Sequence, residues 1–137
     1  CNLGQTIMAK NTYWTVAAAS VLISGFTLAD VGEPNFSLQT TRDLYELCSA
    51  ASDHADYAPA IYACRSFIEA TVQYHDAVSD GKTLKRLICY PSSATLEDAR
   101  TAFVAWAKSN ARDKALMNEM PVMGVVRALE DKYPCRG

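Results

Sequence analysis

The chain has 137 residues, of which 50% are hydrophobic and 20% charged, and its formal net charge at pH 7 is -2. This length and composition are those of one globular domain with a single core. Nucleic acid is excluded as a partner, because phosphate binding requires an excess of clustered Lys and Arg.

The first segment has the pattern of a secretory signal peptide. A short basic stretch leads into an uncharged apolar run from Tyr13, which ends at small residues around Ala29. The run is shorter than the roughly 20 residues of a membrane span. A buried N-terminal core helix is the alternative. We therefore predict an upstream extension over residues 1–7, a signal peptide over 8–29, and a mature periplasmic domain over 30–137 without a membrane anchor.

Four cysteines remain in this mature domain, and export places them in an oxidising compartment where disulfides persist. Three connectivities are possible. We favour Cys48 with Cys64 and Cys89 with Cys135, because each pairing joins consecutive elements and the second holds the C-terminal tail. A zinc site is disfavoured because the cysteines lack close C-x-x-C spacing and no His lies a few residues from a pair.

The residue pattern at the start of the mature domain changes at Thr40. Gly32 and Pro34 predict an extended lead-in that the core holds loosely. From Thr40 onward, apolar residues recur at spacings of three and four, so we expect a first helix capped by Thr40 or Thr41. The polar stretch Ser52–Pro59 is predicted to be the connection to the next helix.

The second predicted helix is the clearest element, and Asp80-Gly81 ends it. Its apolar stripe consists of Ile61, Cys64, Ile68, Thr71, Val72, His75 and Val78.

Two further helices complete the predicted domain. Thr95 and Asp98 resemble a capping box at the start of the third helix, which fades near Asn110. The fourth is predicted over Asn118–Lys132, with Pro121 in its first turn. The inward residues are Leu96, Ala99, Phe103, Trp106 and Ala107 on the third helix and Val122, Val125, Val126 and Leu129 on the fourth. The expected fold is all-α, a compact domain of about four helices stapled by two disulfides.

The sequence offers little catalytic chemistry. Cys64 and His75 share a helix face, but eleven residues separate them by roughly 16 Å, beyond hydrogen-bond reach. His75 is therefore interpreted as a histidine at the edge of the core, and a hydrolase using it is a third hypothesis. His54 is assigned to a solvated linker in preference to a metal site, and Glu69 and Asp76 to surface charge. We predict no catalytic residue, cofactor or metal.

The methionines around Pro121 raise a different possibility, because flexible apolar side chains adapt to partner surfaces. Filling of the core is the favoured role for them, with partner binding as the alternative. The junction between the third and fourth helices is still the first candidate for a protein contact. Its candidate residues are Ser109, Asn110, Arg112, Asp113, Lys114, Met117 and Met120.

Several motifs together resemble one protein family. They are Asp43-Leu44-Tyr45-Glu46-Leu47-Cys48, Tyr62-Ala63-Cys64-Arg65-Ser66-Phe67-Ile68-Glu69, Ile88-Cys89-Tyr90-Pro91 and Ala128-Leu129-Glu130-Asp131-Lys132-Tyr133-Pro134-Cys135. Over roughly Ser37–Cys135 the chain is similar to the Rap/Tai family, the immunity proteins of type VI secretion amidase effectors. It departs from the family in its second helix, where a Gly-rich turn of sequence is often found.

The resemblance implies a small periplasmic helical protein, often a homodimer, that binds a peptidoglycan amidase effector and covers its Cys/His cleft. Such a protein needs no catalytic residue of its own. The expected function is therefore immunity by inhibition of the amidase. A general periplasmic binding or chaperone-like helical protein is the alternative.

Overall fold

The structure, a computed structural model, describes residues 31–79 and 84–135. The predicted extension and signal peptide, and the Asp80-Gly81 helix end, lie outside these residues. The elements in chain order are a 3-10 helix η1 (Glu33–Ser37) and the α-helices α1 (Thr41–Cys48), α2 (Tyr57–Val78), α3 (Leu96–Ser109), α4 (Lys114–Met117) and α5 (Pro121–Lys132). Within the described ranges the only β-type pairing is an isolated bridge between Ile88 and Pro134. The all-α prediction is confirmed.

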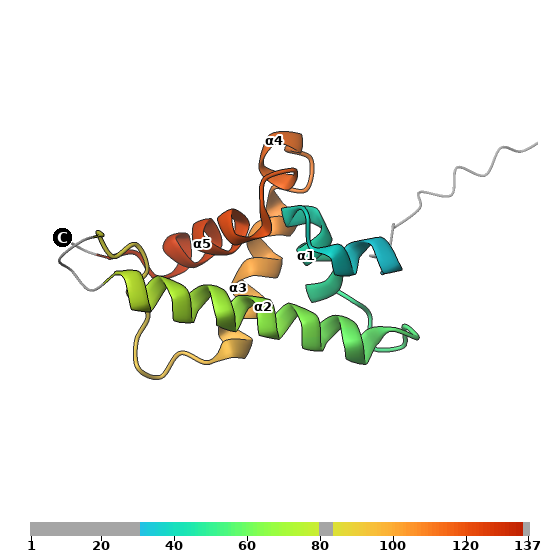
Figure 1. The fold of residues 1–137 in the computed structure, drawn as a ribbon, viewed down its shortest axis with the longest axis horizontal. Helices are drawn as coiled ribbons and strands as arrows, with labels where there is room; N and C mark the ends of the chain where they lie inside the picture. Colours follow the sequence, from blue (N-terminus) through green and yellow to red (C-terminus); the bar gives the residue numbers. More distant parts are fainter. Residues whose placement is uncertain (1–30, 80–83, 136–137) are drawn as a thin grey trace, which may run out of the picture.

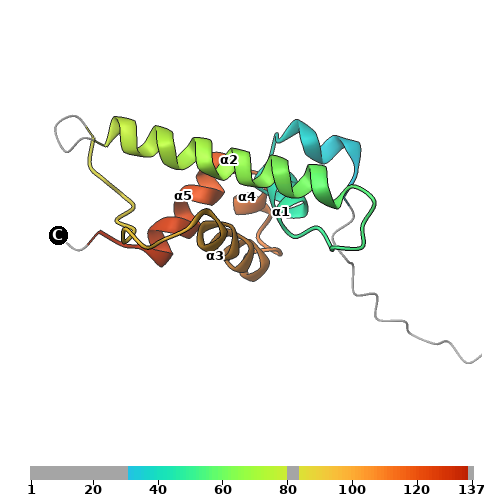
Figure 2. The same ribbon diagram turned by 90° about the horizontal axis from the view of Figure 1, so that it is seen from below.

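The long helix α2 runs the length of the domain, and the other helices pack on one side of it (Figure 1). Turned by 90°, α3 is seen nearly end-on beneath α2, so these two helices cross steeply (Figure 2). Helix α5 packs against α3 and α1, and α1 also contacts α2. The core lies where these four helices meet, and its largest fully buried side chains include Phe103, Leu44 and Ile68.

Capping boxes fix the starts of α1 and α3, as the hydroxyl-x-x-Asp pattern indicates. The Thr40 hydroxyl accepts from the Asp43 backbone N–H at 3.2 Å, and the Asp43 carboxylate accepts from the Thr40 N–H at 2.8 Å. Thr95 and Asp98 make the same pair of bonds at 3.1 and 2.8 Å. Each box satisfies backbone donors that a helix start leaves open.

Helix α2 begins earlier than predicted. Pro59 was expected in the connection, but the helix starts at Tyr57 and Pro59 lies in its first turn. Proline is tolerated there because the first backbone N–H groups of a helix have no partner within it. The predicted stripe is confirmed at Cys64, Ile68 and Thr71, which are buried.

The prediction of a loosely held lead-in is wrong. Residues Glu33–Ser37 form η1, which packs against α1, and Val31 before it is buried in the core. The Asn35 side chain accepts from the Gly32 N–H at 2.9 Å and donates to Asp43 at 3.3 Å. Leu38 then leaves η1 in the left-handed region, with φ 51°.

The segment between α3 and α5 also differs from the prediction. A single helical turn, α4, lies in the predicted junction between the third and fourth helices, and α5 begins at Pro121 rather than at Asn118. Val125 and Leu129 are buried as predicted, whereas Val122 and Val126 are only half-buried and Gly124 and Ala128 are buried in addition. The reason is a close approach of α1, because a Cβ on Gly124 would lie 2.5 Å from Thr41 Cγ2.

Both predicted disulfides form. The inner disulfide joins Cys48 and Cys64 inside the core, where both residues are fully buried, and ties α1 to α2. The outer disulfide joins Cys89, which is exposed, and Cys135, which is half-buried, with a Cα–Cα distance of 4.9 Å. Among the described residues, no helix is long and apolar enough to cross a membrane.

Candidate functional site

His75 anchors the segment that follows α2. Its ring is buried, and Nε2 accepts the backbone N–H groups of Leu87 and Ile88, each at 3.3 Å. The other nitrogen, Nδ1, lies 3.2 Å from the Asp76 carboxylate. A neutral ring with its proton on Nδ1 satisfies all of these contacts at once. His75 is thus a structural histidine, as predicted, and both of its nitrogens are engaged.

Asp76 is the centre of a polar cluster beside this ring. Arg86 donates to Asp76 at 2.6 Å, and the Tyr90 hydroxyl donates to the other carboxylate oxygen. Burial alone raises the pKa of Asp76, but the hydrogen bonds from Tyr90 and His75 and the charge of Arg86 outweigh it, so the pKa lies below its ordinary value. The bond to Asp76 in turn raises the pKa of Tyr90.

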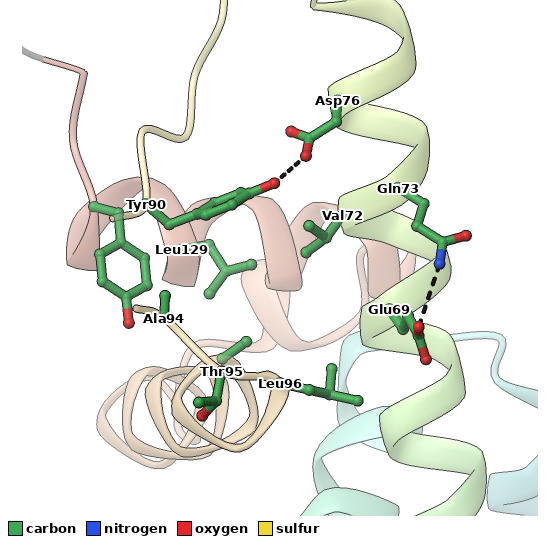
Figure 3. Close-up of a pocket in the computed structure, with 11 residues that line it drawn as sticks. Glu69, Val72, Gln73, Asp76, Tyr90, Ala94, Thr95, Leu96 and Leu129 are labelled. Atoms are coloured by element: carbon green, nitrogen blue, oxygen red, sulfur yellow. Dashed lines mark hydrogen bonds between the residues drawn. The ribbon is translucent and has the colours of Figure 1, made fainter. Parts of the chain in front are cut away.

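A pocket of about 260 Å³ opens next to this cluster, between α2, α5 and the start of α3 (Figure 3). Val72 and Leu129 point into it from α2 and α5, and Tyr90 lies across one side. Asp76, Gln73 and Glu69 follow one another along α2 at its edge. The full lining is Glu69, Val72, Gln73, Asp76, Tyr90, Ala94, Thr95, Leu96, Ala99, Leu129 and Tyr133.

The outer disulfide holds two walls of this pocket together. Cys89 precedes Tyr90, Cys135 follows shortly after Tyr133, and the Cys89 N–H donates to the Tyr133 carbonyl at 2.9 Å. The bridge between Ile88 and Pro134 lies beside this bond. Because the segments are covalently joined, the pocket is largely formed before any ligand arrives, which lowers the entropic cost of binding.

The predicted contact residues lie between α3 and α5, but not all of them are exposed to a partner protein. Arg112, Asp113 and Lys114 are exposed, and Met120 is 64% exposed. Met117 is fully buried, so it fills the core and is not a surface contact. We call the exposed part the junction surface. Its residues are Ser109, Arg112, Asp113, Lys114, Met120 and Met123, with Asn110 half-buried at its edge.

The backbone beneath the junction surface is held from several sides. Asp113 caps α4 by accepting the N–H groups of Ala115 and Leu116 at 2.9 and 3.1 Å. Arg42 donates to the Ala111 carbonyl at 2.7 Å, and the Thr41 N–H donates to the Glu119 backbone carbonyl at 2.8 Å. The Asn110 side chain donates to the Trp106 carbonyl at 2.8 Å. These contacts present the exposed side chains on a fixed frame.

Catalytic chemistry finds little support in these contacts. His75 and Asp76 are adjacent, as in a catalytic triad, but His75 Nε2 accepts backbone N–H groups where a nucleophile would have to lie. The four cysteines that the structure describes, Cys48, Cys64, Cys89 and Cys135, are all in disulfides and cannot attack. Within residues 31–79 and 84–135, no group of His, Cys, Asp and Glu side chains could hold a metal ion. His54 Nδ1 accepts the Asp56 N–H at 3.1 Å, which orders the loop before α2.

The pocket and the Asp76 cluster were missed from the sequence. Their members come from α2, the segment after it, α3 and α5, so no local spacing shows that they meet. The available signal was that His75 and Asp76 are adjacent at the end of an apolar stripe, and that Arg86 and Tyr90 follow Asp76 by 10 and 14 residues. Asp76 was interpreted as surface charge, whereas it is partly buried and has three side-chain partners.

These features describe a small all-helical protein stapled by two disulfides, with an exposed junction surface and a pocket between α2, α3 and α5. Residues 40–135 match the family of Rap1a immunity proteins, and the chain belongs to this family. The resemblance inferred from the motifs is confirmed. An immunity protein acts on a secreted effector, so a protein partner is implied. Neither the curated proteins nor the solved structures include a significant match.

Proposed function

We propose that this protein is a periplasmic immunity protein that binds a type VI secretion peptidoglycan amidase and blocks its active site. The observation that carries the proposal is the family match over residues 40–135, nearly the whole of the described domain. The disulfides favour an oxidising compartment, in agreement with export by a signal peptide over residues 8–29. Inhibition by binding requires no catalytic residue in this chain.

The junction surface is the proposed contact. Met120 is 64% and Met123 38% exposed, and two flexible apolar side chains among charged ones suit the centre and rim of an interface. The fixed backbone beneath them lowers the ordering cost of binding. The proposed contact residues are Ser109, Asn110, Arg112, Asp113, Lys114 and Met120.

The test uses the oxidised mature domain, residues 30–137, and an amidase encoded beside it. Binding is measured by calorimetry, and protection is measured by survival of cells that export the amidase to the periplasm. One tight partner with matching protection supports the proposal. Weak binding to many unfolded proteins, without protection, contradicts it and favours the chaperone-like alternative.

Paired variants then locate the contact. Met120→Asp and Lys114→Glu are expected to weaken amidase binding by about tenfold or more each, because residues near an interface centre contribute most of its energy. Leu84→Asp and Lys132→Glu make comparable changes at exposed positions, Leu84 in the segment after α2 and Lys132 at the opposite end of α5 from Met120, and are expected to leave the affinity within about twofold. The reverse ranking would remove the junction surface from the interface. A monomer–dimer equilibrium, measured by light scattering, tests the homodimer that the family resemblance implies.

A further inference from the structure

The pocket between α2, α3 and α5 has no role in the function proposed above. Val72, Leu96 and Leu129 give it an apolar surface, while its two carboxylates and the Gln73 amide lie along one edge on α2 (Figure 3). A ligand for such a site has an apolar body and a single polar end. The charges at the edge decide which polar end fits.

Every ionisable group in the lining is an acid or a phenol. These groups are the carboxylates of Glu69 and Asp76 and the hydroxyls of Tyr90 and Tyr133, and no Lys, Arg or His lines the pocket. Asp76 is already matched, since Arg86 pairs with it at 2.6 Å. Glu69 accepts only the neutral Gln73 amide, at 3.3 Å, and no ion pair to Glu69 forms within the part of the chain that the structure describes.

We propose that the pocket receives an arginine side chain of the partner protein. Its three methylene groups would lie over Val72, Leu96 and Leu129, and its guanidinium would reach Glu69, with the aromatic ring of Tyr90 nearby. Arginine is suited to this arrangement, since long basic side chains bury their stems on apolar surface and the planar guanidinium stacks on rings and pairs with a carboxylate. The identity of the donor rests on the proposed function; the chemistry of the pocket does not.

A neighbouring hollow shows why this pocket is selective. The groove of about 380 Å³ between α3 and α5 is lined by Asp98, Asp131 and several alanines, but Lys132 stands in it as a cation. It also lacks aromatic walls. A guanidinium gains less there, because Lys132 is part of the lining itself and repels it. Beside the first pocket, Arg86 is already paired with Asp76 and lies over the Tyr90 ring, 5.8 Å from its centroid, so it leaves Glu69 as the carboxylate without an ion pair among the described residues.

The first experiment needs no effector. Nα-acetylarginine methylamide is titrated into the oxidised mature domain and followed by ¹H–¹⁵N NMR, with the isosteric but neutral Nα-acetylcitrulline methylamide as the matched ligand. The arginine compound is expected to shift the amides of Tyr90, Thr95 and Leu96 and to bind about threefold more tightly than the citrulline compound. Equal affinities, shifts elsewhere on the domain, or no saturating shifts would overturn the assignment.

Two variants make the test specific to the pocket. Glu69→Gln is expected to erase the preference for arginine, while Glu130→Gln, at an exposed position on α5 outside the lining, keeps it. Ala94→Leu narrows the pocket and is expected to weaken both ligands by about tenfold. If Ala94→Leu does not fold, as judged by its circular dichroism, the comparison of Glu69→Gln with Glu130→Gln still tests whether the pocket binds arginine. A preference for arginine that survives Glu69→Gln would refute the role of Glu69.

Whether the arginine belongs to the partner protein is tested by a separate measurement. Once a cognate amidase is in hand, Glu69→Gln is expected to weaken its binding about threefold or more, and replacement of one exposed arginine on the amidase is expected to remove the effect of Glu69→Gln. An amidase that binds tightly and ignores both changes would show that its arginines do not use this pocket. The NMR result stands or falls separately from that outcome, so the two failures are distinguishable.

Discussion

Gly124 is where α5 and α1 come closest, and its replacement by alanine tests the packing directly. A new Cβ would lie 2.5 Å from Thr41 Cγ2 and 2.8 Å from Thr41 Oγ1. Thr41 cannot easily move aside, because it is fully buried and its N–H and hydroxyl both bond to the Glu119 carbonyl, at 2.8 and 3.2 Å. The two helices must therefore separate if the methyl group is added.

The size of the effect follows from opposing contributions. Replacing glycine by alanine inside a helix stabilises by about 1 kcal/mol, overpacking a core costs about 1–3 kcal/mol, and each weakened hydrogen bond costs about 1 kcal/mol. We expect Gly124→Ala to lower the free energy of unfolding by about 2 kcal/mol. The melting temperature should then fall by about 10 °C for a domain of this size.

The steric argument is tested by making Gly124→Ala in a protein that already carries Thr41→Ala. Thr41→Ala removes both close atoms and leaves Thr41 Cβ, at 3.2 Å, as the nearest contact to the new methyl group. Adding Gly124→Ala to Thr41→Ala should therefore cost almost nothing, so a double-mutant cycle by urea denaturation should show a coupling of about 2 kcal/mol. Gly32→Ala is the matched control, because its Cβ would meet Pro34 Cδ at an ordinary 3.5 Å. If Gly124→Ala still lowers the free energy of unfolding by about 2 kcal/mol in the Thr41→Ala protein, the steric argument is refuted.

Three other results are expected. Tyr90→Phe should raise the pKa of Asp76, seen by ¹³C NMR titration of the carboxyl group, because a hydrogen bond to the charged form is lost; in the wild type, the stability that the low Asp76 pKa provides should be lost as pH falls through that pKa. His75→Phe should cost about 2 kcal/mol in urea, since it leaves two backbone N–H groups without their acceptor; an unchanged midpoint would contradict the anchoring role. Limited dithiothreitol should reduce the exposed outer disulfide before the buried inner one, as read by alkylation and mass spectrometry; the opposite order would show that burial does not control access.

Local chemistry explains what could be predicted from the sequence. The capping boxes at Thr40 and Thr95 act within one turn, so the starts of α1 and α3 follow from residue types alone. The order of the elements favours the disulfide pairing that the structure shows, although it leaves two other connectivities possible. The apolar stripe of α2 identifies its buried face, since periodicity alone determines which residues share a face.

What could not be predicted depends on contacts between distant segments. The rotation of α5 that buries Gly124 and Ala128 comes from the approach of Thr41, more than eighty residues earlier in the sequence. The lead-in packs as η1 because α1 offers it a surface, which the composition of Gly32 and Pro34 does not show. The pocket likewise requires α2, α3, α5 and the outer disulfide to be in place together.

The most direct test of the proposed function is an inhibition titration. The oxidised mature domain is added in steps to a fixed amount of the neighbouring amidase, and release of peptides from purified peptidoglycan is measured at each step. We predict that activity falls linearly to near zero at one binding site per amidase, and that it does not fall with the reduced, unfolded domain. Full amidase activity in the presence of excess folded protein would contradict the assignment of this chain as its immunity protein.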